Sequence, residues 1–337
     1  MKRLGLLTVI GLLAQFAFAQ QMKIINSIND MPIAGALAIS ADGRLLGVSN
    51  SEGVLSNEVK CGDVAYVSHF AFEEKKIDKN SCNAGVVKLQ PLALQVVVLN
   101  EKDKNAEYVR LRGRVRNFEY TDGEMTFYAE GMSEYYVSLK KKKRIYRDLS
   151  VERYNRGRKE DLSYKGIGRM PFFPLLAQTS EPLTQLSDGN TMRIIRLRGK
   201  EVGSQQNLPA QNSCIVDASG LLRPEVLNVN LFGLRTRGTG AAFYQVYNAC
   251  KTAGEKYGYD NFAGQYFYTA VQSGTKKKMD AVDVFEYFYV TEVEYLSKKE
   301  MKAAIKAKSA KISSPTSQPM VEGLQKGKAG LKPAKRK

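Results

Sequence analysis

The chain has 337 residues, 43% of them hydrophobic, and a formal net charge of +17. This composition agrees with a folded protein that has one or two cores of ordinary size. Residues 301–337 hold ten Lys or Arg and one acidic residue, so more than half of the excess charge lies in this tail. Because the charge is concentrated in the tail, the folded part of the chain is not expected to bind nucleic acid. The tail is expected to be a solvated extension, or one attracted to anionic surfaces.

The N-terminus has the pattern of an export signal. Lys2 and Arg3 precede the apolar run 4–19, which ends in the small-x-small pattern of residues 17–19. We predict a signal peptide over residues 1–19, cleaved after Ala19. An uncleaved anchor is the alternative, but the run is shorter than the ~20 residues that span a bilayer. We therefore expect an exported protein, periplasmic or outer-membrane-associated, with no transmembrane segment in the mature chain.

Residues 22–100 predict a small β-sandwich of the seven-strand, transthyretin-like or immunoglobulin-like type. Short apolar runs alternate with turn-forming residues at regular spacing, which is typical of such modules. The turn signals are Asn29–Pro32 and Ala41–Gly43. The strands are expected at Met22–Asn26, Ile33–Ser40, Leu45–Ser49, Val54–Val59, Asp63–Phe72 and Val86–Asn100.

This segment resembles the carboxypeptidase regulatory-like domain, which is common in exported proteins of Bacteroidetes. The resemblance rests on Pro32–Ala36 after a turn, on Asn50–Val54 before a strand, and on the β-branched run Leu92–Val98. The Gly and Tyr that often follow the penultimate strand of the family are missing from Ser68–Phe72. The resemblance implies a transthyretin-like sandwich that acts in docking or as a spacer, and it does not imply peptidase activity.

Four cysteines permit two disulfides in an exported chain. We prefer the pairs Cys61–Cys82 and Cys214–Cys250, because each stays within one predicted unit. Free buried thiols are the alternative. A metal site is not expected, because the chain has no Cys-x-x-Cys pair and its one histidine is His69.

Residues 108–300 predict a second, β-rich α+β domain, so that the whole fold is mainly β with some α. β-prone segments recur at 108–117, 125–139, 192–197, 213–216, 265–272 and 282–295. We expect one helix over Ala241–Tyr257, ended by Gly258, and another from Lys298 to about Ser309. Residues 310–337, rich in Ser, Pro, Gly and Lys, predict a disordered basic tail.

Two clusters are candidate binding features. The first is the run Lys140, Lys141, Lys142, Lys143 and Arg144, either a solvated hairpin tip or a patch for an anionic surface. The second contains Tyr266, Phe285 and Phe288, either core residues or the lining of a cleft for lipid or sugar. Alternation along a strand would place Phe285, Tyr287 and Tyr289 on one face and Phe288 and Val290 on the other.

No motif in the sequence predicts catalysis. The Gly-x-Ser-x-Gly pattern of serine hydrolases is absent, and a Ser-His-Asp triad through His69 would have to bridge two units. We expect no enzyme activity, cofactor, metal or nucleic acid. The leading hypothesis is an exported envelope protein with an interaction or spacer sandwich and a domain that binds an envelope protein or an anionic surface component. The alternatives are a lipid or lipoprotein carrier with an aromatic-lined curved sheet, and an envelope-polymer hydrolase with unidentified carboxylates.

Overall fold

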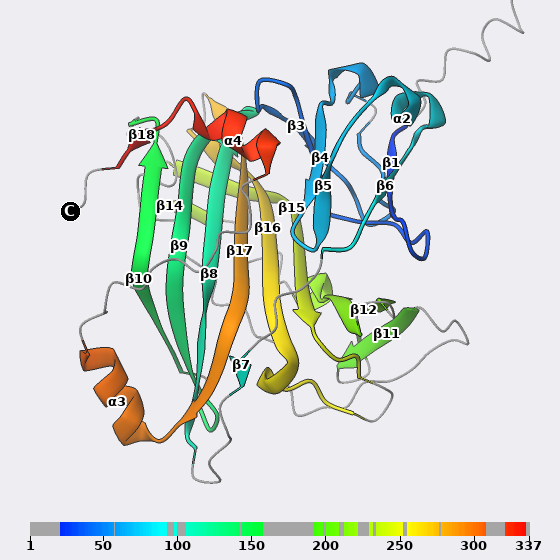
Figure 1. Ribbon diagram of the computed structural model, residues 1–337. Coiled ribbons are helices and arrows are strands. Elements are labelled where there is room, and N and C mark those ends of the chain that lie inside the picture. The colour runs from blue at the N-terminus through cyan, green and yellow to red at the C-terminus, as the bar shows by residue number, and fades with distance from the viewer. Residues whose placement is uncertain are drawn as a thin grey trace, which may run out of the picture.

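The computed structural model describes thirteen segments of the chain, and the predicted signal peptide lies outside them. The described residues are 21–56, 58–92, 98–99, 106–141, 143–157, 192–197, 200–208, 212–221, 229–231, 234–251, 255–275, 278–307 and 321–334. They form a mainly β fold with a few short helices, as predicted (Figure 1).

The N-terminal segment folds as two small sheets, consistent with the predicted sandwich. Strands β1 and β6 pair in parallel, and a second sheet has the antiparallel order β3-β2-β4-β5. Their bounds are β1 Lys23–Asn26, β2 Leu37–Ile39, β3 Leu45–Val48, β4 Tyr66–His69, β5 Phe72–Lys76 and β6 Val86–Leu89. The expected strand at Val54–Val59 is absent from the described part of that range, where Val54 makes a single bridge to Lys23.

Local sequence explains the helix and the turns of the sandwich. Helix α2 (Lys79–Ala84) begins where the Asp78 side chain accepts a hydrogen bond from the Ser81 N–H, and it ends at Gly85 with φ +63°. The hairpin between β2 and β3 turns at Gly43, with φ +88°, where a Cβ atom would lie 2.2 Å from the backbone nitrogen of Gly327. Only glycine meets both demands, because it has no side chain. The short 3-10 helix η2 (Cys61–Asp63) precedes β4.

Most of the described residues from 98 onward form one large sheet, which is antiparallel except where β7 pairs in parallel with β17. Twelve strands are described in it, in the order β11-β12-β13-β15-β16-β17-β8-β9-β10-β18, with β14 and β7 pairing at β15 and β17. The bounds are β7 Val98–Leu99, β8 Tyr108–Thr121, β9 Glu124–Ser138, β10 Arg144–Asn155, β11 Met192–Leu197, β12 Lys200–Leu208, β13 Ser213–Asp217, β14 Val229–Leu231, β15 Leu234–Tyr247, β16 Phe262–Gly274, β17 Met279–Leu296 and β18 Lys332–Pro333. Two 3-10 turns, η6 Ser219–Leu221 and η8 Tyr259–Asn261, connect these strands. Residues 98–99, expected in the sandwich, thus belong to the large sheet.

One predicted helix is wrong and the other is confirmed. Residues 241–247 lie in strand β15, where all of them pair with β16 and residues 244–247 also pair with β13. Pairing on both sides outweighs the weak helical preference of an Ala-rich segment, because intrinsic propensity is only a small energy per residue. Helix α3 (Lys298–Lys306) forms as expected and starts with a capping box between Ser297 and Glu300.

The predicted disorder of the tail is wrong for residues 321–334. Helix α4 (Glu322–Lys328) and strand β18 form there, and Leu324 is 1% exposed. Strand β18 pairs with the end of β10, and α4 lies against β4 and β9 (Figure 1). We name residues 321–334 the C-terminal strap. The strap contacts both the sandwich and the large sheet. The sequence did not predict this docking, because the strap has few apolar residues and several lysines.

The sandwich packs against one face of the large sheet and shares its core. The centre of the Phe70 ring, in the sandwich, lies 4.7 Å from the centre of the Tyr289 ring and 5.5 Å from that of the Tyr287 ring, both on β17. The Tyr266 hydroxyl on β16 donates to the carbonyl oxygen of Gly35 at 2.9 Å. Because one continuous cluster of buried side chains spans both sheets, the sandwich holds a fixed position on the sheet (Figure 1).

Candidate functional site

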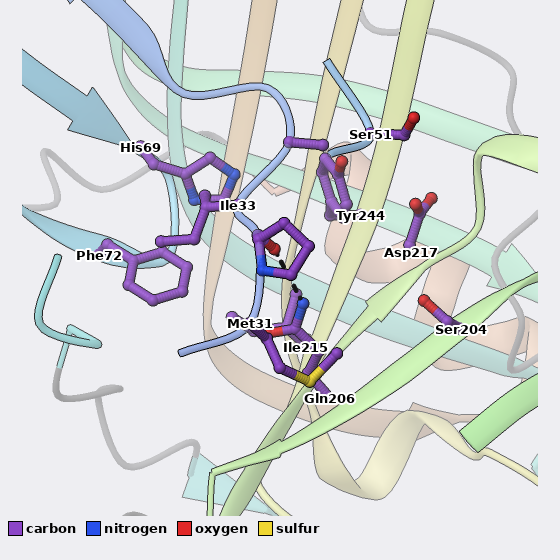
Figure 2. Close-up of a pocket in the computed structure, with 12 residues that line it drawn as sticks. Met31, Ile33, Ser51, His69, Phe72, Ser204, Gln206, Ile215, Asp217 and Tyr244 are labelled. Carbon is purple, nitrogen blue, oxygen red and sulfur yellow. Dashed lines mark hydrogen bonds between the residues drawn. The ribbon is translucent and has the colours of Figure 1, made fainter. Parts of the chain in front are cut away.

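A cavity of about 110 Å³ lies where the sandwich meets the large sheet. Figure 2 shows the side chains that surround it, which come from the sandwich on one side and from strands β12, β13 and β15 on the other. Its lining is Met31, Pro32, Ile33, Ala34, Ser51, His69, Phe72, Ser204, Gln206, Ile215, Asp217 and Tyr244. We name this space the junction cavity.

The sandwich side of the cavity presents His69, which is 4% exposed. Its ring packs edge-on against three aromatic rings. The distances between ring centres are 5.3 Å to Phe72, 5.7 Å to Tyr244 and 5.4 Å to Tyr266. Burial lowers the pKa of His69 to about 3, and a hydrogen bond with the Ala34 backbone acts in the opposite direction. His69 is therefore neutral at physiological pH.

The neutral His69 has a defined tautomer. Its Nδ1 accepts a hydrogen bond from the Ala71 N–H at 3.1 Å, so Nδ1 carries no proton. In a neutral imidazole the proton must then sit on Nε2. Neither nitrogen can take a proton from a substrate at neutral pH, because one already accepts a hydrogen bond and the other already carries a proton. His69 can serve the cavity as a wall or as a hydrogen-bond donor.

The sheet side presents polar residues that alternate along two neighbouring strands. Ser204 and Gln206 come from β12, and Ile215 and Asp217 come from β13, with Gln206 directly opposite Ile215 and Ser204 opposite Asp217. Alternate residues of a strand point to the same face, so these four side chains all face the sandwich. Tyr244 is paired with Asp217 on the next strand, β15. The strand register thus places a carboxyl, an amide and two hydroxyls on the face of the sheet that meets the sandwich.

Gln206 is fixed in orientation by the sandwich. Its Nε2 donates to the carbonyl oxygen of Pro32 at 3.2 Å. Because a carbonyl oxygen cannot donate, this contact assigns the nitrogen, and Oε1 is the free end of the amide. That oxygen is buried and has no hydrogen-bond partner in the described part of the chain. A buried acceptor without a partner is costly, by about 1–3 kcal/mol, unless a ligand or water satisfies it.

Asp217 supplies the carboxyl group of the cavity. One of its oxygens, Oδ1, accepts a hydrogen bond from the Ser219 N–H at 2.8 Å. Burial raises the pKa of Asp217 above that of an ordinary carboxyl, and the hydrogen bonds from Ser219 act in the opposite direction. Burial also raises the pKa of Tyr244 well above its usual value, with a further contribution from the nearby Asp217. Among the described residues, no Lys or Arg forms an ion pair with Asp217.

The aromatic residues predicted to line one cleft lie on two different faces. Tyr266 and Phe285 lie on the face that carries the sandwich, where Tyr266 contacts Phe70 and Phe285 stacks on Tyr268 at 4.9 Å. Phe288 points to the opposite face, as strand alternation predicted. There it lines a second space of only about 20 Å³ together with Leu111, Tyr135, Val137, Arg144, Phe262 and Gln265. Such a space holds about one water molecule.

The basic run 140–144 is the tip of the hairpin between β9 and β10. Lys140, Lys141 and Lys143 are exposed, while Lys142 lies outside the described residues. Arg144 instead turns inward to the small second space, where burial lowers its pKa. The structure thus places three lysines of the predicted patch at the surface and removes Arg144 from it. Whether the tip binds an anionic surface stays a prediction.

One predicted disulfide forms and the other does not. Cys61 and Cys82 are bonded, with Cα atoms 5.4 Å apart, as predicted. Cys214 and Cys250 are free thiols, so the second predicted pair is wrong. Cys214 lies opposite Tyr247 in the sheet, three residues short of Cys250, and its Sγ is 3.3 Å from the Tyr257 hydroxyl. Membership of one predicted unit is therefore not sufficient to pair the two thiols.

A ladder of ion pairs, which the sequence did not suggest, crosses strands β9, β8 and β17. Arginines alternate along β8 on the face that carries the sandwich, and glutamates from the two flanking strands pair with them. Arg112 contacts both Glu134, at 2.8 Å, and Glu292, at 2.7 Å. Because each charge is matched, the ladder is a structural feature of the sheet and not a basic binding surface.

Comparison with known proteins adds no assignment: no protein-family model matches the chain, and no curated protein matches its sequence. Among the residues that the structure describes, no helix is both long and apolar enough to cross a membrane. In the same part of the chain, no three His, Cys, Asp or Glu side chains gather to form a metal site. The resemblance to the carboxypeptidase regulatory-like domain stays a prediction from the sequence.

Proposed function

We propose that this protein is an exported, non-catalytic binding protein of the cell envelope, and that its ligand enters the junction cavity. One observation carries the proposal. Side chains from two separate sheets converge on a cavity of about 110 Å³ that contains a buried amide oxygen without a partner. Concave sites with a few convergent polar groups, placed where two structural units meet, are the usual form of a small-ligand site.

The chemistry of the cavity supports binding in preference to catalysis. A nucleophilic serine needs an adjacent base, and His69 carries its proton on Nε2 while Nδ1 accepts a backbone hydrogen bond. Hydrolysis by paired carboxyls needs two such groups, and Asp217 is the one carboxyl in the cavity lining. The predicted hydrolase therefore finds no support in this site.

The packing of the sandwich supports a structural role for it in forming the site. A spacer module would be joined to its neighbour by a linker with few contacts. Here Phe70 is inserted among Tyr266, Tyr287 and Tyr289, and the C-terminal strap contacts both sheets. We therefore assign the sandwich the role of a fixed wall of the cavity. The carrier hypothesis has less support, because Phe288 lines a space of only about 20 Å³.

The proposal is tested with a variant that fills the cavity. Ser204→Phe adds a ring to a lining residue on β12, while Ser56→Phe adds the same ring at an exposed position of the sandwich and serves as the control. Mature protein purified gently from its own envelope is examined by native mass spectrometry. We expect bound small molecules in the wild type and in Ser56→Phe, and their loss in Ser204→Phe. Equal retention by both variants would contradict the proposed site.

A further inference from the structure

The junction cavity holds one carboxyl group and no cationic side chain. Asp217 is the one acidic residue in its lining, the lining contains no Lys or Arg, and His69 is neutral. The backbone N–H of Ser219 donates to Asp217 Oδ1 at 2.8 Å, and the Ser219 side chain also hydrogen-bonds to this carboxyl group. A partly buried carboxylate is stabilised strongly by a cation that hydrogen-bonds to it. The described chain provides no such cation, and a ligand can provide it.

A second acceptor lies on the same side of the cavity. Gln206 Oε1 is buried without a partner, and its orientation is fixed because Nε2 is held by Pro32. Gln206 and Asp217 lie on adjacent strands and on one face of the sheet, as Figure 2 shows. The hydroxyl of Ser204, which can also accept, lies two residues from Gln206 on the same face. A group with several N–H donors meets these acceptors better than a group with one.

The remaining walls suit a short carbon chain. Met31, Ile33, Phe72 and Ile215 are apolar members of the lining. The volume of about 110 Å³ is smaller than the cavity of about 150 Å³ that holds a benzene molecule, so it fits roughly four or five non-hydrogen atoms. This size suits a small amine such as ethanolamine better than a whole sugar ring or lipid chain.

We propose that the junction cavity binds a primary ammonium group on a short carbon chain, with Asp217 and Gln206 as its acceptors. The proposal rests on the function proposed above and adds the chemical class of the ligand. The ammonium group donates one hydrogen bond to the Asp217 carboxylate and one to Gln206 Oε1, and the carbon chain lies against the apolar wall. An anionic ligand is repelled by Asp217, and a neutral diol leaves the carboxylate without a counter-charge.

The test compares three probes of similar size with the full mature chain at pH 7.5. Ethanolamine is the cation, ethylene glycol the neutral analogue and glycolate the anion, and affinities are measured by NMR titration. We expect ethanolamine to bind at least tenfold more tightly than either analogue. Asp217→Asn, which keeps the acceptor for the Ser219 N–H, is expected to weaken ethanolamine binding at least tenfold. Asp63→Asn, at an exposed position in η2, is the matched control and is expected to bind as the wild type does.

The outcomes separate the two proposals. If all three probes bind equally and Ser204→Phe abolishes their binding, the cavity is a ligand site but the ammonium assignment is wrong. If ethanolamine does not bind, or binds Ser204→Phe as tightly as the wild type, the ammonium assignment is wrong. The proposed function fails with it only if native mass spectrometry also finds no bound molecule that Ser204→Phe loses. Retention of affinity by a folded Asp217→Asn protein, checked by its thermal unfolding, also overturns the ammonium assignment. A lysine side chain also carries a primary ammonium group. Tighter binding of Nα-acetyl-lysinamide than of ethanolamine would therefore indicate that the natural ligand is a lysine of another protein and not a small amine.

Discussion

A single buried carboxyl, Glu286, is expected to make the stability of this protein fall as the pH rises. Glu286 lies on β17 with its side chain on the face opposite the sandwich, directly between Phe267 and Asn117 of the neighbouring strands. It is 3% exposed, and its Oε2 has no hydrogen-bond partner in the described chain. Burial alone raises the pKa of Glu286 to about 8, so the folded protein holds this carboxyl protonated at neutral pH.

The expected size of the effect follows from the difference between the folded and unfolded pKa values. Between the ordinary value of 4.5 and about 8, the folded state binds a proton that the unfolded state releases. The contribution of this group to the free energy of unfolding therefore falls by about 1.4 kcal/mol for each pH unit in that window. The total loss approaches about 5 kcal/mol at pH 8 and above, as an upper limit. Below pH 4.5 both states are protonated and the contribution is constant.

Glu286→Gln removes the titration and keeps the shape of the protonated side chain. The variant should match the wild type in urea unfolding at pH 4, and it should exceed the wild type by about 2 kcal/mol at pH 6 and by up to about 5 kcal/mol at pH 8. Gln265→Glu on β16, another buried position of the same face, is the reverse control and should make the pH dependence steeper. A stability difference that does not change between pH 4 and pH 8 would refute the reasoning.

Three further predictions concern the other buried groups. Leu324→Ala in the C-terminal strap should lower the free energy of unfolding by about 2–5 kcal/mol, because the side chain is 1% exposed; a urea midpoint equal to that of the wild type would show that the strap is not docked. His69 has a folded pKa of about 3 against 6.5 unfolded, so its stabilising contribution is complete above pH 6.5 and is lost as the pH falls toward 3. His69→Gln should therefore flatten the loss of stability between pH 6.5 and 4 in thermal unfolding, and an unchanged acid limb would contradict this. Titration of unreduced protein in denaturant should find two thiols, from Cys214 and Cys250, and no free thiol would mean that they pair.

The local parts of the fold were predictable from the sequence because their causes are local. The turn at Gly43, the helix that begins at Lys298 and the alternation of aromatic residues along β17 each depend on residues that are close in sequence. The Cys61–Cys82 bond was also predictable, because both cysteines lie within one small module. The mainly β fold class is confirmed, and the N-terminal segment forms two small sheets.

The elements that the sequence did not reveal depend on distant partners. Residues 241–247 have an Ala-rich composition that favours a helix, yet they form a strand that pairs with β16 along its length and with β13 at residues 244–247. The junction cavity could not be predicted for the same reason. Asp217 and Gln206 carry no motif, and they become a site only because β12 and β13 pair and the sandwich places Pro32 and His69 opposite them. The alternation of Ser204 and Gln206 was the one sequence feature that pointed to the cavity. It cannot be interpreted until the strand that pairs with β12 and the sandwich that faces it are known.

The C-terminal strap explains how the two walls of the cavity keep their relative position. The Glu74 carboxylate of the sandwich accepts hydrogen bonds from the Glu322 and Gly323 N–H groups at the start of α4, at 2.7 and 3.3 Å. At the other end of α4, the Lys328 ammonium lies 4.0 Å from the centre of the Tyr154 ring on β10. One contact holds the sandwich and the other holds the large sheet.

The strap is thus a second link between the sheets, in addition to the packing of Phe70 on β17. Leu324 and Gly323 lie in the core between these two contacts, and the Gly323 position has its closest neighbours in Glu74, Ile39 and Tyr66 of the sandwich. The strap is remote in sequence from every residue that lines the cavity, yet loss of its contacts would leave the sandwich wall held by one interface instead of two. Ligand binding at Asp217 should therefore weaken in a folded Leu324→Ala protein although no cavity residue has changed, and unchanged affinity would show that the Phe70 interface alone fixes the wall.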